Sequence, residues 1–434
     1  MSGSNTSWSS IIDDLFRGLH RYLRRHRLVL SIAVVAYIVI FNFGQAGLIA
    51  ILATAAAVTL VLLRRSDLRL RFQNRYRNTR LKYQIRTALE RHFELAPRIL
   101  ALVKKASTIL VTLQLQAGQT VDDVAVITEH LAVELGMSQA RVTRSIHNAS
   151  IVTLSLIQGA PLSGKILYWQ DRPSEATSLW DPIPIGIDET GEGITISLPY
   201  SNVIAGGEPG AGKSVFLARI LAQIVRDPES TLFVFDGKPP ELSNWATLAA
   251  GHVETDIDAA IEQIDLICDL MNARYQQLAT LGIKKVRPET GMGLVVVVID
   301  EMPYYVASGK QGKVFAEKVR DLTARGRAAG IVVILTAQKP TADTVPTSIR
   351  DLISLRIAFR CSSVDASNVI LGSGWAGDGY SASTIPLSDR GIGYLLGDLG
   401  IPQLFRSYFI TPEQEAAVIA FAQARILEAG ESNA

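Results

Sequence analysis

The longest apolar stretch of the chain runs from Leu28 to Leu63 and contains no charged residue. One straight helix over these 36 residues would be about 54 Å long, whereas the hydrocarbon core of a membrane is about 30 Å thick. Asparagine, glycine and glutamine within 41–47 interrupt the stretch, as a tight turn would. The pattern predicts a transmembrane hairpin with spans at about 28–43 and 46–63. A long buried helix and a secretory signal peptide are the competing interpretations.

Basic residues flank this hairpin on both sides. Arg24, Arg25 and Arg27 precede it, and Arg64 and Arg65 follow it. Because cytoplasmic loops carry an excess of Lys and Arg, both ends are predicted to lie in the cytoplasm. The sequence therefore predicts a multi-pass protein of the cell membrane with two spans and a cytoplasmic motor domain.

Beyond Asn202 the chain alternates between short apolar runs and amphipathic helices. The runs show little polar alternation, which is typical of strands that crossover helices bury on both faces. The predicted strands cover 202–205, 232–236, 294–299, 331–336, 355–359 and 393–396. This order predicts an α/β fold, a RecA-like P-loop motor domain with a parallel sheet.

The region before the motor is mixed in pattern. Residues 121–135 predict one helix, and Ser138–Arg141 is expected to open a second, as in a small α+β accessory domain. The proline- and glycine-rich stretch 182–186 indicates a boundary. After the motor, a last helix is expected from Thr411-Pro412 to about Ala429.

Charge is distributed unevenly over these parts. Residues 1–105 hold 18 Lys/Arg against 5 Asp/Glu, and the remainder holds 25 against 36. The basic segment before Lys105 is predicted to contact anionic lipid or, alternatively, DNA. Cys268 and Cys361 form neither a metal-ligand nor a disulfide pattern, which indicates a reducing compartment. The predicted organisation is a basic cytoplasmic leader (1–27), the membrane hairpin (28–63), a basic juxtamembrane segment (64–105), the accessory domain (106–190), the motor (191–410) and a C-terminal helix with tail (411–434).

Residues 207–214 read GEPGAGKS and match the phosphate-binding pattern G-x-x-x-x-G-K-[ST] in full. They stand between the predicted strand 202–205 and a predicted helix at 215–225, which is the context that the motif requires. Lys213 would neutralise the β- and γ-phosphates, and Ser214 would bind Mg²⁺. The predicted nucleotide-binding residues are Gly207, Glu208, Pro209, Gly210, Ala211, Gly212, Lys213, Ser214 and Val215, and the predicted cofactors are ATP and Mg²⁺.

Two further strand ends carry candidate chemistry. The strand 294–299 is followed by Asp300, expected to bind the metal through water, and by Glu301, expected to polarise the attacking water. Gln338 follows the next strand and could bind γ-phosphate or water. The predicted catalytic residues are thus Lys213, Glu301 and Gln338. In a ring, a neighbouring subunit could add an arginine, for which the candidates are Arg325, Arg327, Arg356 and Arg360.

Several strings resemble segments of FtsK/SpoIIIE-type DNA translocases. Residues 236–242 (DGKPPEL) are similar to D-P-K-x-x-E-L, and MNARY at 271–275 with Leu281-Gly282 is similar to M-E-R-R-Y…L-G. RAAGI at 327–331, TAQKP at 336–340 and RIAF at 356–359 follow in the family order. The resemblance covers about 200–372. Residues 391–398 match the family's G-x-G-D-M-L segment only loosely, and a winged-helix module is not expected.

This resemblance implies a homohexameric ring that pulls double-stranded DNA through its channel by ATP hydrolysis. The short membrane part fits a conjugative transfer ATPase of a plasmid or integrative element, with a separate DNA-loading or transfer protein as a further partner. The acidic motor region counts against DNA binding, because phosphate contacts supply most non-specific affinity. A protein-export ATPase of a secretion system and a membrane scaffold with a degenerate nucleotide site are the alternatives.

Overall fold

The structure is a computed structural model that describes residues 66–432 except 106, 146, 160–161, 165, 339 and 342–344. The chain divides into two compact units, 1–94 and 95–434. In the first unit, α4 (Ser66–His92) is one arginine-rich helix of 27 residues. It accounts for most of the basic segment predicted at 64–105.

The prediction of a multi-pass membrane protein requires correction. Across the described part of the chain, no helix has both the length and the apolar character that crossing a membrane demands. This finding contradicts the predicted localisation. The predicted spans at 28–43 and 46–63, like the leader 1–27, lie outside the described residues.

The second unit begins with a four-stranded antiparallel sheet in the order β1-β2-β4-β3, accompanied by two short helices. The elements are β1 (Arg98–Lys105), β2 (Thr108–Gln114), α5 (Val121–Val126), α6 (Thr128–Leu135), β3 (Gln139–Arg144) and β4 (Ile151–Ile157). The helix predicted over 121–135 is therefore interrupted at Ile127, and Gly136 ends it with φ 64°. The helix predicted at Ser138 is wrong: Gln139–Arg144 pairs with β4 along its whole length.

A ten-stranded sheet forms the rest of the unit within the described residues, in the order β6-β5-β14-β13-β12-β7-β11-β10-β8-β9. Its strands are β5 (Ile183–Asp188), β6 (Gly193–Ile196), β7 (Val203–Gly206), β8 (Thr231–Asp236), β9 (Gly251–Val253), β10 (Val295–Asp300), β11 (Ile331–Ala337), β12 (Leu355–Phe359), β13 (Ile392–Leu396) and β14 (Gln403–Ser407). The helices are α7 (Lys213–Ile224), α8 (Ser243–Ala246), α9 (Ile257–Thr280), α10 (Met302–Val306), α11 (Gly309–Arg325), α12 (Thr347–Arg350), α13 (Val364–Leu371) and α14 (Pro412–Ser432), with 3₁₀ turns η1 (Pro288–Thr290), η2 (Gly326–Ala329) and η3 (Ala382–Thr384).

All six predicted strands are present, and five of them (β7, β8, β10, β11 and β12) run parallel together with β9. The sixth differs, because β13 pairs antiparallel with β12. Antiparallel β14, β5 and β6 then extend the sheet beyond β13. The expectation of a parallel sheet thus holds for one half of the large sheet. The stretch 182–186, predicted as a boundary, contributes to β5 of this sheet.

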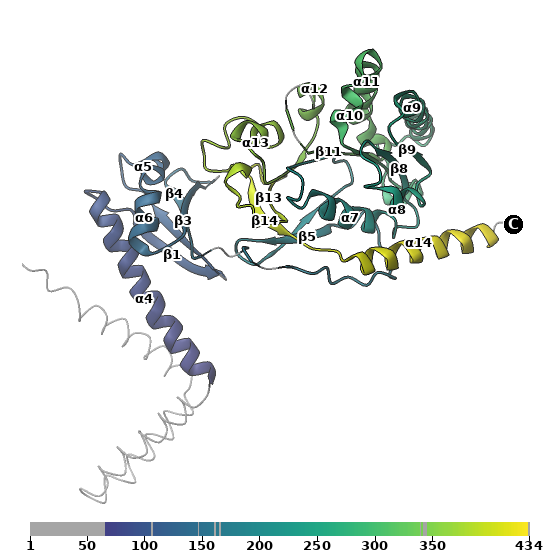
Figure 1. Cartoon of the computed structure of the whole chain (residues 1–434). Coiled ribbons are helices and arrows are strands. Elements are labelled where there is room, and N and C mark those ends of the chain that lie inside the picture. The colour runs from purple at the N-terminus through teal and green to yellow at the C-terminus, as the bar shows by residue number, and fades with distance from the viewer. Residues whose placement is uncertain are drawn as a thin grey trace, which may run out of the picture. The chain divides into compact units, whose positions relative to one another are not determined.

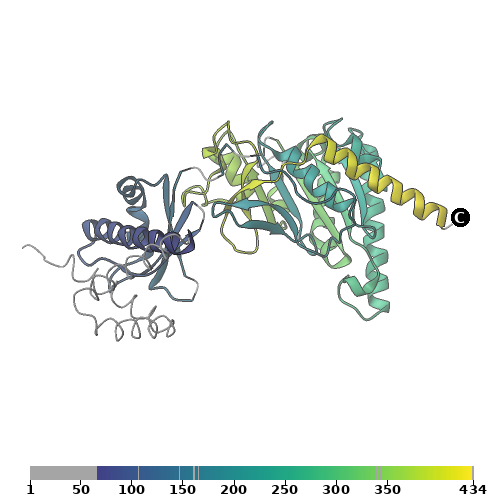
Figure 2. The ribbon, with the colours of Figure 1, turned by 90° about the horizontal axis from the view of Figure 1, so that it is seen from below.

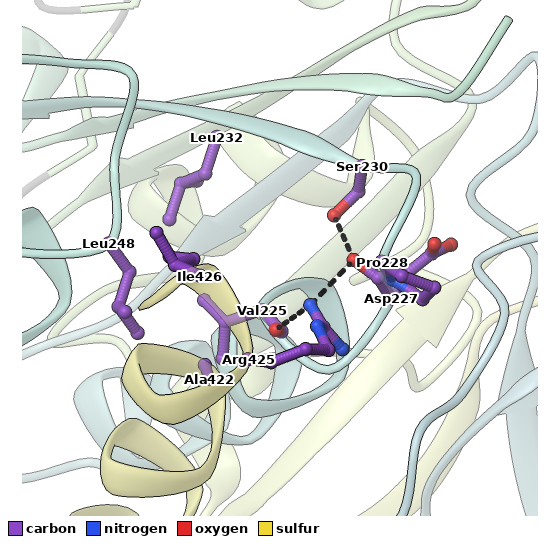
Figure 3. A pocket seen from close by; sticks show the side chains of 9 residues that line it. All are labelled: Val225, Asp227, Pro228, Ser230, Leu232, Leu248, Ala422, Arg425 and Ile426. Atoms are coloured by element: carbon purple, nitrogen blue, oxygen red, sulfur yellow. Dashed lines mark hydrogen bonds between the residues drawn. The ribbon is translucent and has the colours of Figure 1, made fainter. Parts of the chain in front are cut away.

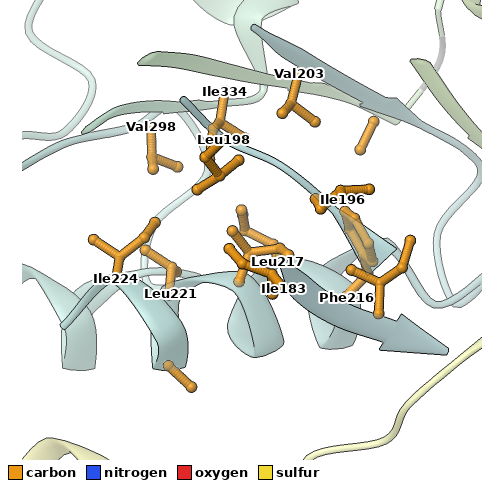
Figure 4. Close-up of a cluster of buried hydrophobic side chains, with 14 of the residues drawn as sticks. Ile183, Ile196, Leu198, Val203, Phe216, Leu217, Leu221, Ile224, Val298 and Ile334 are labelled. Carbon is orange, nitrogen blue, oxygen red and sulfur yellow. The ribbon is translucent and has the colours of Figure 1, made fainter. Parts of the chain in front are cut away.

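Helices cover both faces of the large sheet (Figure 1). One face packs on α7, whose Phe216, Leu217 and Leu221 belong to the same buried cluster as Val203 and Ile334 of the sheet (Figure 4). The other face packs on α9, α11 and α13. Each Å² of apolar surface buried in these two layers contributes about 25 cal/mol, so the layers are the main stabilising contribution. They also hold the carboxyl ends of the parallel strands at one edge.

The last helix, α14, packs on the end of α7 and extends to the end of the described chain (Figure 2). Arg425 of α14 donates to the carbonyl oxygens of Arg226 at 2.7 Å and Val225 at 3.1 Å. These carbonyls are left over at the C-terminal end of α7, where a cation is favourable. Val225 and Arg425 also line a pocket between α14 and the α7–β8 turn (Figure 3). This pocket lies at the opposite end of α7 from the P-loop.

Candidate nucleotide site

The P-loop, residues 207–212, joins β7 to α7 and is held by the two strands beside β7. Gly207 donates its N–H to the carbonyl of Ala337 in β11 at 3.2 Å, and Glu208 donates to that of Arg360 after β12 at 2.9 Å. The Glu208 carboxylate also forms an ion pair with Arg360. Neighbouring strand ends thus fix the loop before any ligand is present.

Gly212 is required at the last position of the loop for two reasons. Its φ of 114° is disfavoured for residues that carry a Cβ. A Cβ added there would also lie 2.7 Å from the backbone of Gly391, whose N–H donates to the Ala211 carbonyl at 2.8 Å. The segment before β13 therefore packs directly on the P-loop.

Lys213, the first residue of α7, is buried and reaches across β11 to the end of β10. Its Nζ lies 2.8 Å from Asp300 Oδ1 and 3.0 Å from Thr336 Oγ1. Lys213 is 3% exposed and Asp300 is fully buried, so the two charges are taken out of water together, which is favourable only when they are well paired. The structure therefore brings together two residues that the sequence predicted to share one site.

Asp300 also presents a free oxygen to this site. Its Oδ2 is buried and has no hydrogen-bond partner among the described residues, and a buried anionic oxygen of this kind is costly unless a ligand meets it. Nowhere in the described chain do three or more His, Cys, Asp or Glu residues cluster as a metal site. This donor set fits Mg²⁺, which binds proteins through one or two oxygen ligands plus nucleotide phosphates. Ser214, exposed beside Lys213, and Asp300 are the residues that would hold it.

Glu301 stands directly after β10 with φ 54° and ψ 55°, a left-handed conformation that is rare for residues other than glycine. Its carboxylate accepts the backbone N–H of Gln338 at 3.1 Å. Burial raises the pKa of this carboxyl, while the nearby Lys213 opposes the shift. The strained backbone and the elevated pKa are both typical of functional carboxylates.

Thr336, one residue before the end of β11, connects the other three groups and was missed by the sequence prediction. Its hydroxyl accepts from Lys213 Nζ at 3.0 Å and from the Glu301 N–H at 3.2 Å, and it donates to Asp300 Oδ1 in a short hydrogen bond. A threonine in a buried strand looks like any β-branched strand residue, so the sequence carried no signal for this role. Gln338, which was predicted, lies next to Glu301 but contacts it through its backbone N–H.

Three of the four predicted arginines lie away from this edge of the sheet. Arg325 and Arg327 precede β11, and Arg356 lies near the start of β12, at the end opposite the P-loop. Arg325 is paired with Asp321 at 2.8 Å, Arg356 donates to backbone carbonyls including that of Arg350, and Arg327 is exposed. They are thus remote from the P-loop of their own subunit, whereas Arg360 contacts it through Glu208.

Two polar residues in the strings that resemble the translocase family hold loops in place. Asp236, buried at the end of β8, accepts the N–H groups of Lys238 at 3.1 Å and Leu242 at 2.9 Å. Arg274 of α9 donates to the carbonyls of Ala329 at 2.9 Å and Gly293 at 2.8 Å. The strings at 236–242 and 271–275 therefore shape loops around the sheet, whereas the string at 336–340 contributes Thr336 to the nucleotide site.

The comparisons with known proteins agree with this geometry. Residues 168–373 match the profile of the FtsK/SpoIIIE family. This stretch, slightly less than half of the chain, is what resembles an FtsK/SpoIIIE domain. DNA translocase FtsK of Borreliella burgdorferi is 24% identical over 303 residues, covering 66% of this chain and 38% of that protein. DNA translocase FtsK of Haemophilus influenzae is 28% identical over 307 residues, covering 61% and 57%. The chain thus matches less than two thirds of the length of either relative.

Solved structures resemble this chain in fold. The pCW3 conjugation coupling protein TcpA, solved as a monomer with ATPγS, superposes with a TM-score of 0.55 at 19% identity, covering 80% of this chain and 99% of that chain. ATPases 2 and 3 of EssC from Geobacillus thermodenitrificans give 0.50 at 17% identity, covering 62% and 52%. The predicted family resemblance is confirmed for residues 168–373, and these solved structures share the fold.

Proposed function

We propose that this protein is an ATP-driven translocase of double-stranded DNA that moves plasmid or integrative-element DNA in conjugation. The observation that carries the ATPase part is the buried cluster of Lys213, Asp300 and Thr336 with Glu301 beside it. It combines a phosphate-binding lysine, a free carboxylate oxygen and a carboxylate base at the carboxyl edge of one sheet. Such an edge is where open α/β sheets bind ligands.

The proposed reaction uses these groups in turn. When ATP enters, the Lys213 ammonium moves from its partners Asp300 and Thr336 to the β- and γ-phosphates. Glu301 orients the attacking water and accepts its proton, and its elevated pKa makes it a stronger base. Mg²⁺, when bound, supplies positive charge to the phosphates. Thr336 keeps Asp300 and the Glu301 backbone aligned while Lys213 shifts.

A basic loop supports DNA as the polymer. Lys284, Lys285 and Arg287 fall within four positions between α9 and β10, in a part of the chain that is otherwise acidic. Lys285 Nζ lies 3.9 Å from the centre of the Tyr200 ring, and Trp180 adjoins that ring at 6.1 Å between centroids. Basic and aromatic side chains lining one open groove suit a nucleic-acid backbone.

The proposed assembly is a homohexamer with the DNA in its channel. In such a ring an arginine could reach the ATP of the next subunit, and Arg325, Arg327 and Arg356 remain the candidates, since all three are remote from their own P-loop. The likeness to the conjugation coupling protein TcpA supports conjugation as the process. A separate DNA-loading or transfer protein is proposed as a further partner. The name of the FtsK relatives supports DNA as the cargo.

The proposal is tested by ATP hydrolysis of the full chain with and without long double-stranded DNA, at low and moderate salt. We expect a several-fold stimulation that salt reduces, because counterion release makes phosphate contacts salt-dependent. Arg287→Ala should reduce the slope of log affinity for DNA against log salt concentration by about one. Arg172 is an exposed arginine on another loop, and Arg172→Ala serves as the control. Robust hydrolysis that ignores DNA would contradict the proposal and favour a protein-export ATPase.

A further inference from the structure

A turn in the antiparallel half of the sheet forms one wall of the nucleotide site. Residues 386–391 join η3 to β13. Because β13 is antiparallel to β12, with Gly393 opposite Phe359, it begins where β12 ends. The turn therefore lies at the same edge of the sheet as the P-loop.

Backbone contacts join this turn to the P-loop. Gly391 donates its N–H to the Ala211 carbonyl at 2.8 Å, and its backbone atoms leave no room for a Cβ on Gly212. Gly391 itself has φ 78° and no side chain to displace the loop. The residue before it, Arg390, is thus presented at the border of the phosphate-binding loop.

The turn is fixed from behind by a buried ion pair. Asp389 accepts from Ser163 Oγ at 2.6 Å and lies 3.7 Å from Arg406 Nη2, and both partners of the pair are 6% exposed. Arg406 also donates to the Arg390 carbonyl at 3.1 Å. Ser407 donates its N–H to the Gly391 carbonyl at 2.8 Å. These contacts therefore hold the backbone of Arg390 in place.

The guanidinium of Arg390 is available for a ligand. The residue is exposed, and none of the described residues forms a hydrogen bond or ion pair with its side chain. The other arginine at this border, Arg360, is already paired with Glu208 of the P-loop. A free guanidinium beside a phosphate-binding loop has a matching partner in the phosphates, which arginine binds in a bidentate manner.

We propose that Arg390 binds the phosphates of ATP in its own subunit. In the sheet order, β10 with Asp300 and Glu301 lies two strands from β7 on one side, and β13 lies two strands from β7 on the other. Arg390 would therefore enclose the nucleotide from the side that faces away from the carboxylates. This inference rests on the proposed function, since it assumes that the P-loop binds ATP.

The test is equilibrium binding of a fluorescent ATP analogue with Mg²⁺ to the full chain and to four variants. Arg390→Ala should weaken binding about tenfold, as expected for loss of one charge-assisted contact, and Arg390→Lys should restore part of it. Arg172→Ala should bind like the wild type, because the Arg172 backbone accepts from Arg226, beyond the end of α7 that is opposite the P-loop. Lys213→Ala reports on the P-loop itself.

Salt provides a second readout that does not depend on absolute affinity. Raising the ionic strength should weaken binding to the wild type more than binding to Arg390→Ala, because the variant has one charge fewer to screen. Binding by Arg390→Ala within twofold of the wild type, with the same salt dependence, would overturn the inference, as would unchanged binding combined with loss of DNA stimulation. A wild type that binds no nucleotide, or binds it equally after Lys213→Ala, would instead contradict the proposed function.

Discussion

The two halves of the large sheet differ in what they contribute to the site. In the parallel half, β10 and β11 are buried at every position. The polar groups of one edge lie at or directly after the carboxyl ends of β7, β8, β10 and β11. In the antiparallel half, β6 alternates between buried and exposed positions and β5 is buried only in part. This half supplies no predicted catalytic residue, yet its turn 386–391 supports the P-loop. The predicted catalytic residues lie on or directly after the parallel strands, and the antiparallel strands position a turn against the P-loop.

Among the variants that compare the two halves, Lys213→Ala in the parallel half should have the largest effect, a loss of nucleotide binding. The change removes the phosphate-binding cation and leaves Asp300 buried without its ion-pair partner. We expect nucleotide binding to weaken at least about a hundredfold, measured by titration with an ATP analogue. Lys310→Ala, an exposed lysine at the start of α11, is the control. Retained tight binding would show that the cluster is not the nucleotide site.

Glu301→Gln should separate binding from hydrolysis. The amide keeps the size of the side chain but cannot accept the proton of water, so hydrolysis should fall about 10²–10⁴-fold while binding persists. In the wild type, hydrolysis should fall as the pH is lowered through the pKa of Glu301, because the protonated carboxyl is no longer a base. Since burial raises that pKa, this loss should occur at a pH above the range of an exposed glutamate.

The matched control for Glu301→Gln is Glu317→Gln, an exposed glutamate of α11. Its turnover and pH profile should follow those of the wild type. Hydrolysis by Glu301→Gln at the rate of the wild type would remove Glu301 from the role of base.

Thr336→Val should give an intermediate effect and tests the residue that the sequence did not reveal. Valine preserves the shape of the side chain but removes the hydroxyl that contacts Lys213, Asp300 and the Glu301 N–H. We expect turnover to drop about tenfold, with a smaller change in the ATP concentration needed for half-maximal rate. Thr336→Ser should recover most of the rate. Equal rates for valine and serine would reduce Thr336 to a packing residue.

Asp389→Ala examines the antiparallel half and should act mainly on stability. The change deprives the buried Arg406 of its carboxylate partner, although two carbonyl acceptors remain. The free energy of unfolding should decrease by about 1–3 kcal/mol, measured by denaturant titration. Asp398→Ala, in the loop after β13, should change it little. A large loss of turnover without loss of stability would show that the antiparallel half takes part in the chemistry itself.

The sequence predicted the parallel half well because its strands are continuous apolar runs. The run at 294–299 and the P-loop pattern at 207–214 define their elements without help from the rest of the fold. The strand β5 contains Pro184 and Gly186, and β6 has only 4 residues. Only pairing with neighbouring strands in the folded chain makes these segments strands. The polar segment Gln139–Arg144 is likewise a strand because β4 pairs with it.

The sequence predicted those site residues that belong to local motifs. Lys213, Asp300 and Glu301 belong to motifs with a fixed relation to a strand end, and the structure brings them together. Thr336 and Arg390 are ordinary residue types in ordinary surroundings along the chain. Their positions follow from strand order, with β11 between β7 and β10 and with β13 beyond β12, and strand order is a property of the folded chain.

Movement along DNA is the central claim, and displacement of a third strand measures it directly. A linear duplex carrying a bound triplex-forming oligonucleotide is mixed with the full chain and ATP, and release of the oligonucleotide is followed over time. The account predicts release that requires ATP, becomes slower as the duplex arm leading to the triplex is lengthened, and is absent with Glu301→Gln. Vigorous ATP hydrolysis in the presence of this DNA without release of the third strand would contradict it.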